Sequence, residues 1–412
     1  MPPLKEKRIL LGVTGSIAAY KAVELASRLT QAGALVDTIL TQAATRFVAP
    51  LTFQSVTARQ AYADQDLWNG QEHVLHVKLA EWADIIVIAP ATANTIAKLA
   101  HGLAEDLLSL TALSFTSSPP RIITPSFLIA PAMDAGLWKN PAIQKNVATL
   151  KKQGALTIGP EQGHLASGLD AAGRMSEPEN IFREIRYQLS RRGPLAGKKF
   201  VVTAGPTQEP IDPVRFLGNP SSGKQGFAVA QAALDQGAQV TLIAGPTALA
   251  APRGAEKIDV QTAEEMTNAV LSNCPRADAL VMTAAVADFK PAKSYAQKLK
   301  KENGLTGINL KRTQDILTQV GRLKKKTGWP KIVVGFAAET ENLIANAQDK
   351  LNKKALNLIV ANNIAQPGRG FQSDTNQAIL LAPGSVPKTL PLMTKEKTAV
   401  EILARITLLL KN

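Results

Sequence analysis

The chain has 412 residues, of which 47 are lysine or arginine and 33 are aspartate or glutamate, so its formal net charge is +14. Hydrophobic residues make up 45% of the chain, enough for buried cores, and this length is typical of two domains. A nucleic-acid-binding protein would combine such a charge with interleaved aromatic side chains. Aromatic residues make up 5% here, so nucleic-acid binding is the alternative class and we expect no nucleic-acid partner.

Cysteine occurs once, at Cys274, which excludes intrachain disulfides and zinc clusters built from several cysteines. The apolar run within residues 1–13 is too short for a signal peptide. No apolar run reaches the length of a membrane span. We therefore expect a cytoplasmic protein without a membrane partner.

The first half of the chain begins with the pattern of a βαβ unit. Residues 8–40 read as a strand, a glycine turn, an amphipathic helix, a glycine and a second strand. Two later apolar runs, at 83–90 and 126–131, predict further buried strands. This half is predicted to be a doubly wound α/β domain with a parallel sheet.

The second half repeats that beginning at residues 197–245, with a longer loop before the helix. Further strands are predicted at 277–284, 331–337, 356–362 and 377–383. The basic, Gly/Pro-containing stretch 190–199 predicts the boundary, and therefore domains at 1–190 and 191–412. The fold class is α/β, with two doubly wound parallel-sheet domains.

Two turns of the first half follow strands and open helices. Gly15 and Ser16 lie in the first, and Thr92 and Asn94 lie in the second. A helix N-terminus favours a phosphate, and neighbouring turns at the carboxyl ends of strands mark a crevice. A mononucleotide such as FMN fits such a crevice. The alternative is that the glycines serve only tight turns.

Three other residues of the first half are candidates for chemistry. His76 precedes the strand at 83–90, although a lone histidine is more often a packing or surface residue. Asp134 follows the strand at 126–131 and would equally suit an N-cap. Ser167 lies in the glycine-rich stretch HLASGLDAAGRMSEP, which predicts a mobile loop over 164–178.

In the second half, residues 218–225 nearly spell a phosphate-binding P-loop, GNPSSGKQ. We reject that interpretation because Gln225 replaces the hydroxyl residue that holds magnesium, and because the loop begins well after its strand. Lys350 and Lys354 lie four residues apart, on one face of a predicted helix. A solvated surface is the usual explanation of such a pair.

Several motifs together resemble known families. GVTGSIAAYK, HVKLAEWAD, APATANTIAKLAHGLAEDLL, PAMDAGLW and GRMSEP resemble the flavin-dependent cysteine decarboxylases. TAGPTQEPIDPVRFLGNPSSGKQG, AAVADFKPA, KLKK, GFAAETENL and KLNKKALNLIVANN resemble phosphopantothenate–cysteine ligase. In this order they resemble the bifunctional phosphopantothenoylcysteine decarboxylase/phosphopantothenate–cysteine ligase family of coenzyme A biosynthesis.

The resemblance implies FMN-dependent decarboxylation in the first half. Its FMN-contacting positions are Gly15, Ser16, Thr41, Thr92 and Asn94, and its catalytic positions are His76, Asp134 and Ser167. The family has a cysteine where this chain has Ser167, and that cysteine protonates the enethiolate left by decarboxylation. It has an asparagine that holds the substrate carboxylate where this chain has Asp134. Both differences predict an impaired decarboxylase. The alternative is an active ligase whose N-terminal half serves only as a flavin-binding or assembly scaffold.

For the second half the resemblance implies a CTP-dependent, Mg²⁺-assisted ligation of phosphopantothenate with cysteine through an acyl-cytidylate. Asn219 and Lys298 match its catalytic positions. The stretch QDIL at 314–317 departs from the family's sequence at those positions, and Asn363 departs from it as well. The resemblance also implies a homo-oligomer, with trimeric flavin domains and paired ligase domains. The CTP-contacting positions are Asp288, Lys298, Gln314, Asp315, Ile316, Leu317, Phe336, Lys350 and Lys354.

Overall fold

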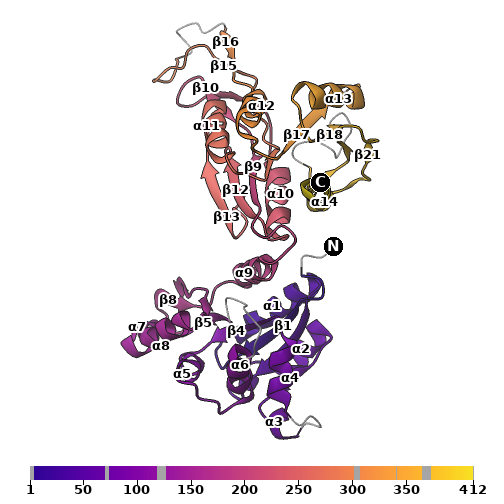
Figure 1. The fold of residues 1–412 in the computed structure, drawn as a ribbon. Helices are drawn as coiled ribbons and strands as arrows, with labels where there is room; N and C mark the ends of the chain where they lie inside the picture. Colours follow the sequence, from indigo (N-terminus) through magenta and orange to yellow (C-terminus); the bar gives the residue numbers. More distant parts are fainter. Residues whose placement is uncertain are drawn as a thin grey trace. The chain divides into compact units, whose positions relative to one another are not determined.

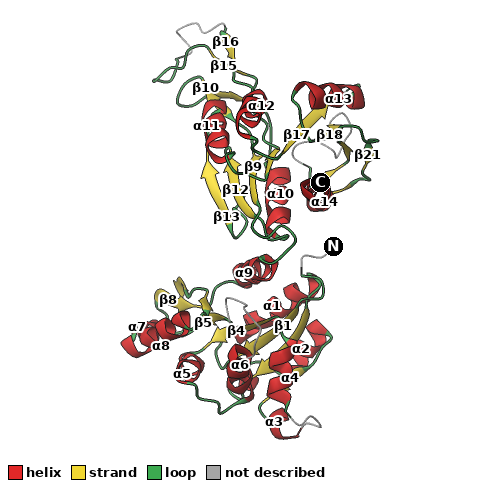
Figure 2. Cartoon of the chain, viewed as in Figure 1, coloured by secondary structure: helices red, strands yellow, loops and turns green. Residues whose placement is uncertain are grey.

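The computed structural model of the chain describes residues 4–69, 74–117, 127–300, 307–339, 341–363 and 373–411. It divides into two compact units, residues 1–189 and 190–412. Each unit is an α/β structure (Figures 1 and 2). No helix in these described ranges combines the length and apolar character needed to cross a membrane.

The N-terminal unit is built on a six-stranded parallel sheet in the order β3-β2-β1-β4-β5-β6. Without the short edge strand β3, this is the order of flavodoxin-like sheets, and the strand order reverses between β1 and β4. The strands are β1 (Arg8–Val13), β2 (Leu35–Leu40), β3 (Ala61–Ala63), β4 (Ile85–Ala91), β5 (Leu128–Pro131) and β6 (Leu156–Thr157).

Helices cover both faces of this sheet. Along β1, Ile9 and Leu11 belong to one apolar core and Leu10 to the other, as the alternation of side chains along a strand requires. The first core includes side chains of α1 (Ala19–Gln31), α2 (Pro50–Thr57) and α9 (Pro178–Ser190). The second includes side chains of α4 (Leu75–Trp82), α5 (Ala93–His101), α6 (Leu107–Ser117) and α8 (Pro141–Lys152). Three short helices, η1 (Ala44–Arg46), α3 (Asp66–Asn69) and α7 (Ala135–Lys139), complete the unit.

The stretch expected to be a loop at 164–178 is instead largely a β-hairpin, so that expectation is wrong. Strand β7 (Glu161–His164) pairs antiparallel with β8 (Asp170–Arg174), and residues 165–169 form the turn. Of the two glycines in this stretch, Gly168 lies in the turn with a φ of +83° and open space around it, whereas Gly173 serves close packing. A Cβ on Gly173 would lie 2.3 Å from the carbonyl oxygen of Met133, and the Met133 N–H donates to the Gly173 carbonyl at 3.0 Å.

The C-terminal unit has an eight-stranded sheet in the order β13-β12-β9-β14-β17-β18-β20-β21. The first six strands are parallel, β20 is antiparallel to β18, and the order reverses between β9 and β14. The strands are β9 (Lys199–Ala204), β12 (Gln239–Ala244), β13 (Ala255–Asp259), β14 (Ala279–Met282), β17 (Ile332–Glu339), β18 (Leu358–Asn363), β20 (Ala378–Leu381) and β21 (Lys388–Thr389). Two doubly wound parallel sheets were expected, and both are confirmed.

Helices and small hairpins surround this second sheet. The helices are α10 (Lys224–Leu234), α11 (Ala263–Asn273), α12 (Ile316–Thr327), α13 (Leu343–Lys353) and α14 (Lys395–Lys411). The paired short strands are β10 (Gln208–Pro210) with β11 (Phe216–Gly218), β15 (Phe289–Pro291) with β16 (Leu310–Arg312), and β19 (Thr375–Asn376) with β22 (Met393–Thr394). The hairpin of β10 and β11 lies between β9 and α10. The loop at 218–225 therefore does not follow its strand directly, which agrees with the rejection of a P-loop there.

Helix α10 lies unusually close to the sheet, and a glycine permits this. A Cβ on Gly226 would come within 2.4 Å of the Thr283 hydroxyl oxygen and 2.5 Å of the Ala204 Cβ. Both neighbours belong to the reversal point between β9 and β14. The helix N-terminus is therefore set tightly against the carboxyl ends of these strands.

We predict that Gly226→Ala destabilises the C-terminal unit by about 1–3 kcal/mol, the usual cost of overpacking a filled core. Urea titration of amide hydrogen exchange in β9 and β14 measures this. Gly321→Ala is the matched control, because Gly321 lies inside α12 and a Cβ there would meet open space, so alanine should be neutral or stabilising. Equal protection of wild type and Gly226→Ala would contradict the packing argument.

Candidate functional sites

The N-terminal unit has a pocket of ≈ 510 Å³ between the β1–α1 turn and the β7–β8 hairpin. It brings together three predicted site residues, Ser16, Asp134 and Ser167. Its wall also contains Lys21 of α1 and Arg174 of β8. Gly15, Thr41, Thr92 and Asn94 are not part of this wall, although they belong to the same edge of the sheet.

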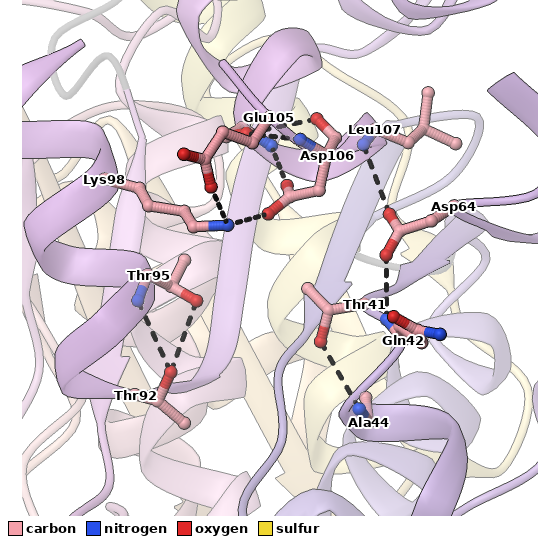
Figure 3. Close-up of polar contacts among 11 residues, drawn as sticks. Thr41, Gln42, Ala44, Asp64, Thr92, Thr95, Lys98, Glu105, Asp106 and Leu107 are labelled. Atoms are coloured by element: carbon pink, nitrogen blue, oxygen red, sulfur yellow. Dashed lines mark hydrogen bonds and ion pairs between the residues drawn. The ribbon is translucent and has the colours of Figure 1, made fainter. Parts of the chain in front are cut away.

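The remaining predicted turns lie at the carboxyl ends of β1, β2 and β4, which are neighbours in the sheet. Gly15 is pressed against the turn after β2, since a Cβ there would lie 2.5 Å from the Ala43 Cβ. Thr41 accepts the Ala44 N–H at 3.3 Å, and Thr92 caps α5 by accepting the Thr95 N–H at 3.4 Å (Figure 3). Asn94, in the first turn of α5, is exposed.

Two polar clusters brace this edge, and neither was predicted from the sequence. Asp64 accepts the N–H groups of Gln42 at 2.9 Å and Leu107 at 3.2 Å, which ties the turn after β2 to the start of α6 (Figure 3). The Lys98 ammonium contacts Glu105 and Asp106, each at 3.0 Å. Burial would raise the pKa of Asp106, but the Ser109 N–H and Lys98 outweigh it and lower that pKa.

Asp134 and Ser167, the two positions that differ from the resembled family, contact each other. The Ser167 hydroxyl donates a hydrogen bond to the Asp134 carboxylate, and this bond, with the Gly136 N–H, lowers the pKa of Asp134. Asp134 is also the N-cap of α7, where it accepts the Gly136 N–H at 2.8 Å. At neutral pH this carboxylate is therefore ionised.

A lysine of this pocket was also missed. Lys21 is 7% exposed, and its ammonium lies 2.9 Å from a Glu177 carboxylate oxygen, which lowers the pKa of Glu177. The pair links α1 to the segment after β8. A lysine on a predicted amphipathic helix gives no sequence signal of burial, because its long side chain usually reaches water.

His76 is not brought into the pocket. It lies in the first turn of α4, and its Nδ1 is buried without a hydrogen-bond partner among the described residues. A buried imidazole nitrogen without a partner is costly, since buried polar groups are normally paired. In one copy of the chain, His76 and the pocket of Asp134 and Ser167 are therefore separate features.

The C-terminal unit has two adjoining pockets at the carboxyl edge of its sheet. The first, which we call the α12 pocket, has a volume of ≈ 510 Å³. Apart from Lys298, it gathers every residue that the resemblance assigned to CTP: Asp288, Gln314, Asp315, Ile316, Leu317, Phe336, Lys350 and Lys354.

The second pocket, which we call the α10 cavity, has a volume of ≈ 400 Å³ and lies at the N-terminus of α10. Asn219 lines it, and the Asn219 amide donates to the Val286 carbonyl at 3.0 Å. Asp288, Phe336 and Lys350 line both pockets, so the two share a wall. A ligand in one can therefore reach a ligand in the other.

The lysines of the α12 pocket are held in place by neighbours. Lys350 donates to the Phe336 carbonyl at 2.9 Å, and Lys354 contacts the Asp315 carboxylate and the Thr318 hydroxyl, the latter at 2.7 Å. Burial would raise the pKa of Asp315, but Lys354 and the Thr318 N–H lower it overall. Lys350 lies in α13, but Lys354 follows the end of that helix as its C-cap. The expectation that these two lysines lie on one helix is therefore wrong. Both nevertheless face the α12 pocket.

Lys298 is exposed and lines neither pocket. The next residue is anchored, because the Leu299 N–H donates to Asp212 at 3.2 Å and its carbonyl accepts from Arg215 at 2.9 Å. Residues 301–306, the rest of this lysine-rich run, lie outside the described residues. The Asn363 side chain lies outside them too.

The described residues hold no group of three or more histidine, cysteine, aspartate and glutamate side chains that could bind a metal ion. Cys274 is buried in the core of the C-terminal unit, and burial raises the pKa of its thiol to about 12. Its thiol is therefore not a nucleophile at neutral pH.

We predict that Ser167→Ala raises the pKa of Asp134 toward its ordinary value, because it removes a hydrogen bond that favours the charged carboxylate. Carboxyl ¹³C NMR titration of aspartate-labelled protein measures this, and Asp134→Asn identifies the resonance. Ser176→Ala is the control, since that serine is not a partner of Asp134. An unchanged titration in Ser167→Ala would show that the Asp134–Ser167 bond does not form in solution.

Two family models match this chain, at different residues. The family model "Flavoprotein" matches residues 2–190, and the model "DNA/pantothenate metabolism flavoprotein C-terminal domain" matches residues 195–409. A solved C-terminal domain of a coenzyme A biosynthesis bifunctional protein CoaBC covers 53% of this chain and 98% of its own, at 39% identity and a TM-score of 0.45. A solved mutant of PPC decarboxylase, complexed with pantothenoylaminoethenethiol, covers 44% of this chain and 97% of its own, at 32% identity and a TM-score of 0.38.

Whole proteins match over nearly their full length. The coenzyme A biosynthesis bifunctional protein CoaBC of Bacillus subtilis (strain 168) is 44% identical over 412 residues, 99% of this chain and 98% of that protein. That of Mycobacterium tuberculosis (strain CDC 1551 / Oshkosh) is 43% identical over 388 residues, 91% of this chain and 90% of that protein. The chain belongs to the family of bifunctional coenzyme A biosynthesis proteins CoaBC, with a flavoprotein domain and a ligase domain.

Proposed function

We propose that the C-terminal unit uses CTP to activate the carboxylate of 4'-phosphopantothenate. A free carboxylate has no leaving group, and attack of its oxygen on the α-phosphorus of CTP forms an acyl-cytidylate and releases pyrophosphate. The cysteine amine then displaces CMP. The observation that carries this proposal is the α12 pocket, which gathers eight CTP-assigned residues beside the cavity of Asn219.

The charges of the two pockets support this chemistry. In-line transfer at phosphorus needs neutralisation of the phosphate oxygens, which lysines and helix N-termini provide. Lys350 and Lys354 face the α12 pocket, and the N-terminus of α10 opens the adjoining cavity. Mg²⁺ usually binds through substrate phosphates and one or two carboxylates. Asp288 fits that role, since it lies on the wall shared by both pockets.

We predict that Lys298→Ala lowers the rate of phosphopantothenoylcysteine formation by at least about two orders of magnitude, the usual cost of removing one charge-stabilising donor. The rate is measured with phosphopantothenate, cysteine, CTP and Mg²⁺. Lys300→Ala is the matched control, because Lys300 is an equally exposed lysine of the same run. Near-normal turnover in Lys298→Ala would remove Lys298 from the mechanism. Pyrophosphate release that does not depend on CTP and phosphopantothenate would contradict the function itself.

For the N-terminal unit we propose FMN as the flavin, held at the reversal point between β1 and β4. The turns at Gly15–Ser16, Thr41 and Thr92–Asn94 lie at the carboxyl ends of three adjacent strands, where such sheets bind mononucleotides. The pocket that Ser16, Asp134 and Ser167 line has room for the substrate. When bound, the flavin supplies the two-electron oxidation that prepares the cysteinyl group for loss of carbon dioxide.

The residues around that pocket argue for a weak decarboxylase. An ionised Asp134 repels the substrate carboxylate and cannot donate to it, and loss of one charge-assisted hydrogen bond costs about 1.5–3 kcal/mol. Ser167 is a poorer proton donor than the family's cysteine, since a thiol titrates near pH ~8.5 and an alkanol several units higher. Its proton is also engaged by Asp134.

We also propose a homo-oligomer, as the family resemblance implies. His76 does not line the pocket of Asp134 and Ser167. A second copy of the chain packed against that pocket would supply the histidine.

We predict that wild-type protein forms little phosphopantetheine from phosphopantothenoylcysteine, and that Ser167→Cys combined with Asp134→Asn restores most of the turnover. Each single change should rescue little, because residues that act as one unit are non-additive. Equal flavin content in all four proteins is the control. Robust turnover by wild type would show that another residue donates the proton. An inactive double variant that retains flavin would favour a flavin-binding or assembly role for this unit.

A further inference from the structure

Three residues that line the α10 cavity carry side-chain oxygens for which the described part of the chain offers no hydrogen-bond partner. Gln225 Oε1, Asn362 Oδ1 and Asn376 Oδ1 are buried without a hydrogen-bond partner among the described residues, and all three residues line this cavity. Asn376 is 3% exposed. Leaving a buried acceptor unpaired costs about 1–3 kcal/mol, so three in one cavity point to a ligand that donates hydrogen bonds.

The orientation of one of these amides is fixed by its other end. The Gln225 Nε2 donates to the Lys395 carbonyl at 3.2 Å, which leaves Oε1 as the end without a partner. The three oxygens come from the start of α10, the end of β18 and the strand β19. Acceptors from three separate elements whose residues line one cavity suit a donor with several N–H groups, such as an ammonium.

The same cavity also has a cationic side. Lys395, the first residue of α14, lines it and is 6% exposed. Burial and the nearby Lys224 lower the pKa of Lys395. Lys224 lines the cavity as well, and its ammonium contacts the exposed carboxylate of Asp374.

We propose that the α10 cavity is the cysteine subsite of the ligase, with the substrate ammonium on the amide oxygens of Gln225, Asn362 and Asn376 and its carboxylate on Lys395. This rests on the proposed ligase function and adds the site of its second step. A free α-amino acid carries a cation and an anion on one carbon, and this cavity offers both complements. A phosphate group complements the cationic side but not the amide oxygens, because phosphate and amide oxygens are both acceptors.

The position of the cavity fits the order of the reaction. The wall shared with the α12 pocket places a bound amine beside the acyl-cytidylate. Pyrophosphate leaves first, which vacates the cationic side. The ammonium then loses a proton to solvent, its nitrogen lone pair attacks the acyl carbon, and a second proton leaves as the amide forms. The acyl C–O bond breaks, and CMP departs with its electron pair.

The first test separates the two half-reactions with Asn376→Leu. The KM for cysteine should rise at least about tenfold, the effect of losing one hydrogen bond to a charged group. Pyrophosphate release from CTP and phosphopantothenate without cysteine should be unchanged. Asn376→Asp retains the acceptor and should keep the KM low. Asn352→Leu, an exposed asparagine outside the cavity, is the control.

The second test measures substrate selectivity to detect the contact between the cysteine carboxylate and Lys395. Lys395→Met should lower the preference for L-cysteine over cysteamine, which lacks the carboxylate, by at least about tenfold in kcat/KM. This ratio cancels any effect on the first half-reaction. Lys397→Met, an exposed lysine of the same helix, should leave the ratio unchanged.

The outcomes distinguish the subsite from the function. A wild-type protein that releases no pyrophosphate overturns the proposed ligase function. A wild-type protein that does, with an unchanged cysteine KM in Asn376→Leu and an unchanged ratio in Lys395→Met, overturns the subsite. If Asn376→Leu instead raised the KM for phosphopantothenate and not that for cysteine, the amide oxygens would bind N–H or O–H donors of phosphopantothenate. That result would also overturn the cysteine subsite.

Discussion

Both units depend on one constraint, which is the reversal of strand order in a parallel sheet. Where the order reverses, the helices that follow the two neighbouring strands pack on opposite faces, and no helix covers the strand ends between them. This happens between β1 and β4 in the first unit and between β9 and β14 in the second. The turn after β1 contributes Ser16 to the N-terminal pocket, and Thr283 after β14 lines the α10 cavity. Glycine permits a close approach at the reversal in the second unit, at Gly226 against Thr283; in the first unit Gly15 permits one on the other side of β1, against Ala43 after β2.

The Asp134–Ser167 contact explains why the two differences from the resembled family belong together. A carboxylate accepts hydrogen bonds, and a hydroxyl with no other engagement donates one, so each residue satisfies the other. An asparagine at the same place would present an amide donor to a substrate carboxylate. The same two positions can therefore either engage a substrate or hold the hairpin turn against the β5–α7 connection. In this chain the interaction of the Ser167 hydroxyl with the Asp134 carboxylate favours the second arrangement.

The sequence predicted the sheets well, because parallel strands buried on both faces are continuous apolar runs that stand out from their surroundings. Residues 83–90 and 331–337 became β4 and β17. The hairpin of β7 and β8 was missed because its strands carry glycine and charge instead of alternating apolar residues. Of the candidate site, motif resemblance alone located the residues that now line the α12 pocket, since no periodicity marks Asp288 or Gln314.

What the sequence could not indicate were residues whose importance arises from burial. Lys21, Lys395 and Asn376 are of types that are normally exposed, and nothing in their neighbours along the chain marks them as buried. Their environments depend on segments far away in the sequence, such as Glu177 for Lys21. A buried amide without a partner is visible only when the whole hydrogen-bond arrangement is known.

The excess of positive charge has a specific distribution around the ligase pockets. Lys224 and Lys354 are paired with the carboxylates of Asp374 and Asp315, which are exposed enough for such pairs to be weak. A phosphate can therefore displace either carboxylate at little cost. Lys395 differs because it is already buried, so the free-energy cost of removing water from its ammonium arises on folding and not on ligand binding. An anion that reaches Lys395 replaces little water around the ammonium. Selectivity at that position then depends on the neighbouring groups, and the unpaired amide oxygens there favour an anion that also carries N–H donors.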